Sequence, residues 1–191
     1  MNTTRLEAFS DAVIAILMTI MVLELKAPHG AEFEALRPLT PVFLAYVLSF
    51  IYLAIYWNNH HHMLQATKKV NGKVLWANTH LLFWLSLVPF ATAWMGENNF
   101  QPVPTAVYGV VLLCAAIAYT ILQSTIIHHE KGENSILATA VRRDFKGKFS
   151  IACYLIAIPL AFVNQWISDA IYTGVALWWL IPDRRIEDKI S

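Results

Sequence analysis

The sequence predicts an all-α integral membrane protein with six transmembrane helices in a single domain, residues 1–191. Hydrophobic residues make up 57% of the chain and charged residues only 14%, whereas a soluble domain carries roughly a quarter charged residues. The charges cluster between long apolar runs, the pattern expected when lipid surrounds the runs and water surrounds the loops. The formal net charge of +1 gives no reason to expect nucleic acid as a partner.

The six helices follow from the lengths of the apolar runs. Crossing the hydrocarbon layer takes about 20 helical residues at a rise of about 1.5 Å each. Six apolar segments appear on this measure, the sixth of them short: 5–26, 40–65, 74–95, 105–128, 148–165 and 168–182. They alternate with short polar stretches, which predicts a multi-pass membrane protein.

Glycine and proline mark the ends of these segments in chain order, as expected for turns. The first four connections contain Pro28 and Gly30, then Gly72, then Gly96–Pro104, then Gly132–Gly147. Only a few residues, around 165–169, separate the fifth segment from the sixth. The last two segments are therefore predicted to form a tight helical hairpin.

The distribution of basic residues predicts the orientation. With a cytoplasmic N-terminus, all but two of the 14 lysines and arginines fall on the inner side, the exceptions being Lys26 and Arg37. Inner loops of membrane proteins carry an excess of Lys and Arg. We therefore expect both termini in the cytoplasm and the protein in the cell (inner) membrane.

The first helix carries polar groups at unusual depth. Twelve apolar or small residues separate Asp11 from Glu24, and they cover only about 18 Å of a bilayer core that is about 30 Å thick. Ser10, Asp11 and Glu24 must therefore lie within the hydrocarbon core of the bilayer or close to it. A carboxylate there costs several kcal/mol unless it faces water or a partner, so we expect a functional or network-forming role.

One face of the same helix is mainly aliphatic. At about 100° per residue, Ile16, Thr19, Ile20 and Leu23 fall within an arc roughly 100° wide. We refer to these four residues as the isoleucine–threonine stripe. Composition alone favours packing of this stripe against neighbouring helices, because the helix is apolar nearly all round.

Three motifs resemble those of a known family. Arg5–Ile16, with the pattern R-x-x-x-F-S-D through Phe9, Ser10 and Asp11, resembles the signature of the bacterial branch of the lysosomal potassium channel family (transmembrane protein 175 type). Tyr56–His61 is similar to the end of that family's second helix, and Trp76–Asn78 with Pro89–Phe90 to its third helix.

The resemblance implies a homotetramer whose first helices surround a central pore. It implies that the isoleucine–threonine stripe lines this pore, with Thr19 as a hydroxyl layer among the aliphatic layers of Ile16, Ile20 and Leu23. It also implies a hydrogen-bonded network that holds the pore helix. The expected members are Arg5, Phe9, Ser10, Asp11, Trp57, His60 or His61, and Asn78.

Together, the resemblance and the composition of the first helix predict a leak-type cation channel that prefers potassium. The sequence has no T-V-G-Y-G stretch, so selectivity is expected from side-chain rings rather than backbone carbonyls. A ring of Ile16 would constrict the pore, a ring of Thr19 would offer oxygens to K⁺, and Glu24 at the mouth would attract cations. The expected partners are copies of the chain, lipid and monovalent cations, with no cofactor beyond the permeant K⁺.

Two other hypotheses about the function have weaker support. A proton-coupled transporter could use Asp11 with His60 or His61 as a proton relay within the membrane. The adjacent histidines also suggest a metal site, but consecutive helical residues point about 100° apart and the H-E-x-x-H spacing is missing. No nucleophile–base pair or nucleotide motif is evident, so we expect neither an enzyme nor a bound metal.

Overall fold

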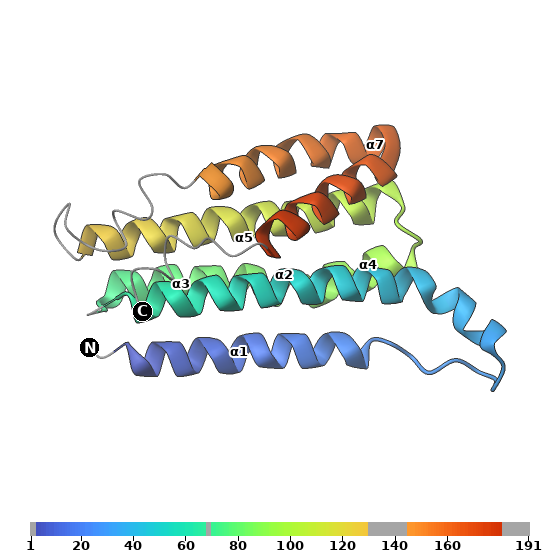
Figure 1. Cartoon of the computed structure of the whole chain (residues 1–191), viewed down its shortest axis with the longest axis horizontal. Helices are drawn as coiled ribbons and strands as arrows, with labels where there is room; N and C mark the ends of the chain where they lie inside the picture. Colours follow the sequence, from blue (N-terminus) through green and yellow to red (C-terminus); the bar gives the residue numbers. More distant parts are fainter. Residues whose placement is uncertain (1–2, 68–69, 130–144, 181–191) are drawn as a thin grey trace.

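The structure is a computed structural model that describes residues 3–67, 70–129 and 145–180. Every regular element within these ranges is a helix. The elements are α1 (Thr4–Leu23), the 3₁₀ helix η1 (Phe33–Leu39), α2 (Thr40–Gln65), α3 (Gly72–Ser86), α4 (Val88–Glu97), α5 (Pro102–His129) and α7 (Phe145–Leu180). Figure 1 shows the long helices side by side in an elongated bundle, with α1 along one edge and α7 along the opposite edge.

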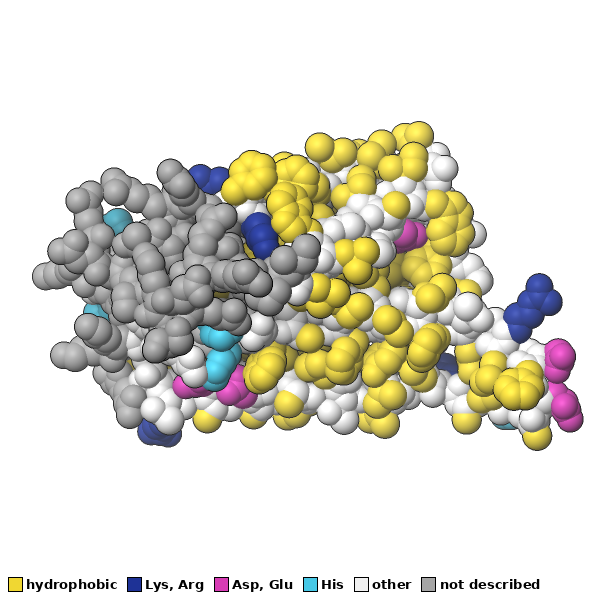
Figure 2. Space-filling model, in the orientation of Figure 1, with side chains coloured by type: hydrophobic (Ala, Val, Ile, Leu, Met, Phe, Trp, Pro, Cys, Tyr) yellow, Lys and Arg dark blue, Asp and Glu magenta, His cyan; other side chains and the backbone are white. Residues whose placement is uncertain are grey.

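Five helical stretches in the described ranges are long and apolar enough to cross a membrane. They are Thr4–Leu23, Phe33–Gln65, Gly72–Glu97, Pro102–His129 and Phe145–Leu180. On the face drawn in Figure 2, hydrophobic side chains cover much of the length of the bundle, and charged side chains gather mainly toward its ends. This distribution fits an apolar solvent around the middle of the bundle and water at both ends.

The last stretch, α7, is folded back on itself. A straight helix of its 36 residues would be about 54 Å long. Instead Trp179 Nε1 donates a hydrogen bond to Ser150 Oγ at 2.9 Å, and Ser168 Oγ donates to the carbonyl of Ala157 at 2.7 Å. The backbone leaves the helical region at Asn164 (φ −159°, ψ 107°), and the Asn164 side chain accepts a hydrogen bond from Trp166 N. The predicted hairpin therefore lies within one element, and residues 181 and 182 of its second arm fall outside the described ranges.

Several helix boundaries differ from the prediction by up to three residues. Helix α1 ends at Leu23 rather than at residue 26, with a turn at Glu24, whereas α5 begins at Pro102 rather than at residue 105 and α7 at Phe145 rather than at residue 148. The predicted helix 74–95 is divided at Leu87 into α3 and α4. Pro89 explains this division, since it has no N–H to donate and its ring crowds the carbonyl four residues earlier. The short η1 was not predicted.

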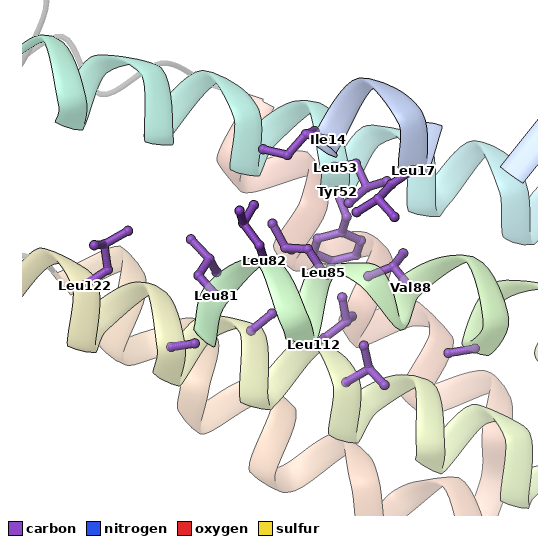
Figure 3. Packing of buried hydrophobic residues seen from close by; sticks show 14 of the residues in the cluster. Ile14, Leu17, Tyr52, Leu53, Leu81, Leu82, Leu85, Val88, Leu112 and Leu122 are labelled. Atoms are coloured by element: carbon purple, nitrogen blue, oxygen red, sulfur yellow. The ribbon is translucent and has the colours of Figure 1, made fainter. Parts of the chain in front are cut away.

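A continuous hydrophobic core holds α1 to the rest of the subunit. Helix α1 contacts α2, α3 and α4, while α5 packs between α3 and α7. Figure 3 shows core side chains contributed by these helices, among them Ile14 of α1, Leu53 of α2 and Leu85 of α3, each fully buried. The core therefore fixes which face of α1 is turned toward the subunit and which is left free.

Candidate functional site

Helix α1 has one buried face and one exposed face. Its buried residues are Leu6, Ser10, Ile14, Leu17 and Met21, at the three- and four-residue spacing of a single helix face. The isoleucine–threonine stripe lies roughly opposite. Ile16 is 57% exposed, Ile20 39% and Leu23 73%, and Thr19 is also exposed. Within the described ranges the stripe is therefore largely exposed, so packing against the other described helices of the same chain does not explain it.

The hydroxyl of Thr19 has its hydrogen committed inside the helix. Thr19 Oγ1 donates to the carbonyl of Ala15 at 2.8 Å. A hydroxyl oxygen has two acceptor lone pairs besides this hydrogen. An exposed oxygen whose hydrogen already points at the backbone presents mainly acceptor capacity, which suits a cation.

Ser10, Asn78 and His60 form a fully buried chain of hydrogen bonds at the inner part of α1. Ser10 Oγ donates to the carbonyl of Leu6 at 2.8 Å and accepts from Asn78 Nδ2 at 2.9 Å. Asn78 Oδ1 lies 2.7 Å from His60 Nε2. Because the Asn78 amide nitrogen is used on Ser10, its oxygen must accept, so Nε2 of His60 carries the ring proton. The hydrogen bonds tie α1 to α2 and α3, and among the described residues His60 Nδ1 has no hydrogen-bond partner.

A second cluster lies nearer the surface. Trp57 Nε1 donates to Asp11 Oδ1 at 3.0 Å, and His61 Nδ1 lies 3.0 Å from Glu7 Oε1. The rings of Trp57 and His61 stack with their centroids 6.0 Å apart. His60 and His61 thus contribute to different clusters, as expected for consecutive residues that point about 100° apart on a helix.

The sequence analysis did not include Glu7 in the network, although a signal for it was present. Glu7 and Asp11 are four residues apart on α1, and Trp57 and His61 are four residues apart on α2. Residues at this spacing share one helix face. Two such pairs on successive helices can face each other, and the structure brings them together in antiparallel order.

Two other members of the expected network lie apart from both clusters. Arg5 is exposed in the first turn of α1, and its guanidinium makes no hydrogen bond or ion pair within the described ranges. Phe9 is exposed on α1. Glu24 is exposed at the C-terminal end of α1, the end remote from both clusters.

The geometry gives a relay between Asp11 and the histidines no direct support. Among the described residues, Asp11 makes its hydrogen bond with Trp57, and His60 makes its own with Asn78. His61 contacts Glu7 instead. The described residues also contain no group of three or more His, Cys, Asp or Glu side chains placed to hold a metal ion.

Comparison with known proteins accounts for this arrangement. The family model described as "Endosomal/lysosomal potassium channel TMEM175" matches residues 5–89, which include both clusters and the stripe. A protein of Chryseobacterium sp. (strain P1-3), named as a potassium channel, is 55% identical over 191 residues that cover 100% of this chain and 99% of the relative.

Two further matches are more distant. The crystal structure of a lysosomal potassium-selective channel TMEM175 homolog from Chamaesiphon minutus superposes with a TM-score of 0.81. It is 28% identical and covers 94% of this chain and 96% of that one. A Gallus gallus relative, named as an endosomal/lysosomal proton channel, is 27% identical over 147 residues, which cover 69% of this chain and 29% of the relative.

These relatives are named as channels rather than as enzymes, and the Chamaesiphon minutus channel shares the fold described above. The match to the Chryseobacterium channel, with 55% sequence identity, covers the whole of this chain. The chain belongs to the TMEM175 family.

Proposed function

We propose that this chain forms a homotetrameric, potassium-preferring leak channel in which the four α1 helices surround a central pore. The proposal rests chiefly on the isoleucine–threonine stripe, an exposed apolar face on a helix whose opposite face belongs to the subunit core. One such helix cannot enclose a pore, so the channel needs several copies arranged around an axis. The names of the relatives support K⁺ as the permeant ion.

Lipid could also cover an exposed apolar face, but α1 has features that favour an axial position. Its buried face carries the Ser10–Asn78–His60 chain, and the adjacent Asp11–Trp57 bond fixes its rotation. A pore helix needs a defined rotation, because a rotation of a few tens of degrees would replace one lining residue by another.

The proposed conduction path follows from the stripe. A ring of Ile16 side chains forms the narrowest layer and can close by dewetting. Thr19 lies one turn further along and supplies a ring of hydroxyl oxygens to a partly dehydrated cation. Potassium holds its hydration shell less tightly than sodium, so a constriction with few ligands favours potassium modestly. Glu24, exposed beyond the last turn of α1, raises the cation concentration at the outer mouth.

The proposed membrane arrangement has six crossings, counting the two arms of α7 separately, and both termini in the cytoplasm. Figure 1 places the start of α1, the start of α3, the end of α5 and the start of α7 at one end of the bundle. The described basic residues at that end are Arg5, Lys73, Lys146 and Lys148, whereas Lys26 and Arg37 lie at the other. The excess of positive charge supports placing this end inside the cell.

The test is ion flux from the purified full-length chain in liposomes, with potassium and sodium gradients, followed by single-channel recording. Ile16→Ser should raise unitary conductance, because a smaller and polar side chain widens and wets the constriction. Ile156→Ser on α7 is the matched control, since Ile156 is also 57% exposed. Equal conductance in the two variants would remove Ile16 from the pore, and an absence of potassium flux from the wild-type protein would refute the channel itself.

A further inference from the structure

An open groove lies between the start of α3 and the end of α5, away from α1. Two adjoining hollows make it up, with volumes of about 560 Å³ and about 730 Å³. Both include Asn71, Lys73, Ile121 and Thr125 in their linings. Volumes of roughly 300–1,000 Å³ are typical of clefts that hold ligands. None of the proposed conduction steps uses this groove.

One end of the groove is polar and basic. It is lined by Asn71, Lys73, Ser124, His128 and His129, among others. The Lys73 ammonium is exposed and has no ion-pair partner within the described ranges. The end therefore presents a positive charge that nothing in the described subunit neutralises.

The hydrogen bonds around Asn71 determine which ring nitrogen of His129 can donate a hydrogen bond. Asn71 caps α3, its Oδ1 accepting from Val74 N at 3.0 Å. Its amide nitrogen therefore faces His129 Nδ1, 2.9 Å away, and must donate to it. With Nδ1 accepting, Nε2 of His129 bears the ring proton. His129 is thus held as a hydrogen-bond donor beside the Lys73 ammonium.

The other end of the groove is apolar and lies further from the ends of α3 and α5, toward the middle of the bundle. Trp76, Ala77 and Ile121 line it, and the Trp76 side chain is 77% exposed. Exposed apolar side chains continue along α5 at Ile117 and Val110, on the same helix face as Ile121. Tryptophan is enriched where protein meets the headgroup region. The groove thus passes from basic donors near the helix ends to an aliphatic surface at membrane depth.

We propose that this groove binds an anionic phospholipid, with the phosphate of its headgroup at Lys73 and His129 and an acyl chain along Trp76 and Ile121. Basic pockets between transmembrane helices on the cytoplasmic side are the sites that fit anionic headgroups. Free phosphate would account for the donors but not for the apolar end, and a neutral lipid would leave the Lys73 charge unmatched. The site lies outside the proposed pore, and its cytoplasmic placement rests on the orientation proposed above.

The test measures binding of three probes to the full-length protein in detergent, by native mass spectrometry or calorimetry. Dioctanoyl phosphatidylglycerol has headgroup charge and chains, dioctanoyl phosphatidylcholine has the same chains without net charge, and glycerol phosphate has no chains. We expect the first to bind most tightly. Lys73→Gln should weaken it about fivefold, the effect of one lysine near an anionic surface. Ile121→Gln should weaken both lipids and leave glycerol phosphate unchanged.

Lys148→Gln is the matched control, because Lys148 is an exposed lysine at the same end of the bundle and does not line the groove. Three outcomes would overturn the proposal: equal binding of the two lipids, binding of glycerol phosphate as tight as phosphatidylglycerol, or equal effects of Lys73→Gln and Lys148→Gln. Lack of any lipid binding, with the groove covered by another copy of the chain, would overturn it too. The assay needs no ion flux, so it can fail or succeed independently of the channel proposal.

Discussion

Replacing Asn78 with alanine tests whether the buried chain of hydrogen bonds holds α1 against the subunit. Asn78→Ala removes two bonds at once, the one to Ser10 Oγ at 2.9 Å and the one to His60 Nε2 at 2.7 Å. His60 then keeps no hydrogen-bond partner for either ring nitrogen, because its Nδ1 already lacks one. All three residues are fully buried in the wild-type protein, so the groups left unpaired by the substitution face the interior rather than bulk water.

The expected loss of stability is about 2–4 kcal/mol. Leaving a buried polar group unpaired costs about 1–3 kcal/mol in soluble proteins, and two groups are affected here. Hydrogen bonds between membrane helices have been measured to contribute only about 0.6 kcal/mol on average. We therefore expect a loss of stability below the upper limit that the two penalties would give together. Ser10→Ala should cost less, since it breaks only one of the two bonds and removes a smaller side chain.

The assay is unfolding of the purified protein in mixed micelles with increasing sodium dodecyl sulfate, followed by circular dichroism at a fixed protomer concentration. The double variant with Ser10→Ala should cost less than the sum of the single variants, because both remove the same bond. Thr79→Ala is the control: Thr79 is the next residue of α3, exposed, and bonded only to the carbonyl of Leu75. If Asn78→Ala costs no more than Thr79→Ala, the buried chain does not anchor α1.

Three further predictions concern other parts of the bundle. Thr19→Ala should lower potassium-over-sodium selectivity while the channel still assembles, and an unchanged reversal potential under mixed ions would remove Thr19 from the mechanism. Gly96→Ala should destabilise the protein by about 1–3 kcal/mol, since its Cβ would lie 2.7 Å from the Val42 Cα. Gly174→Ala, which meets nothing within 4 Å, should leave the thermal midpoint unchanged or raise it. Asp169→Asn should raise the melting temperature, because it replaces a buried carboxylate, which has no hydrogen-bond partner among the described residues, by an uncharged amide that costs less to bury. A lower melting temperature would contradict this.

The sequence predicted the positions of the long helices better than the points at which a helix is interrupted. Helix α2 runs from Thr40 to Gln65, the bounds predicted for the second segment from its long apolar run and the polar turns that follow it. The division at Leu87 was missed because hydropathy does not change there, and only Pro89 marks it. Hydropathy counts the length of an apolar run, whereas the missing N–H of a proline acts on one turn of it.

Only part of the expected network comes together in the structure. Arg5 and Phe9 lie apart from both clusters, and Glu7 was not expected in them. Ser10 was indicated by its place beside an apolar run, where burial without a partner is costly, and Asn78 by the family motif that begins at Trp76. The sequence left open whether His60 or His61 joins them, and the structure separates the two histidines into different clusters. That outcome depends on the rotation and depth of α2 against α1, which a single sequence does not specify.

In the proposed channel, the two faces of α1 would separate folding from permeation. Residues such as Ile14 and Leu17 hold the helix in the subunit, while Ile16 and Ile20 are exposed and lie outside that core. If the exposed face lines the pore as proposed, a substitution there would alter what passes through the assembly without costing the protomer its fold. Channels built in this way could then diverge in ion preference, one lining residue at a time, on an unchanged scaffold.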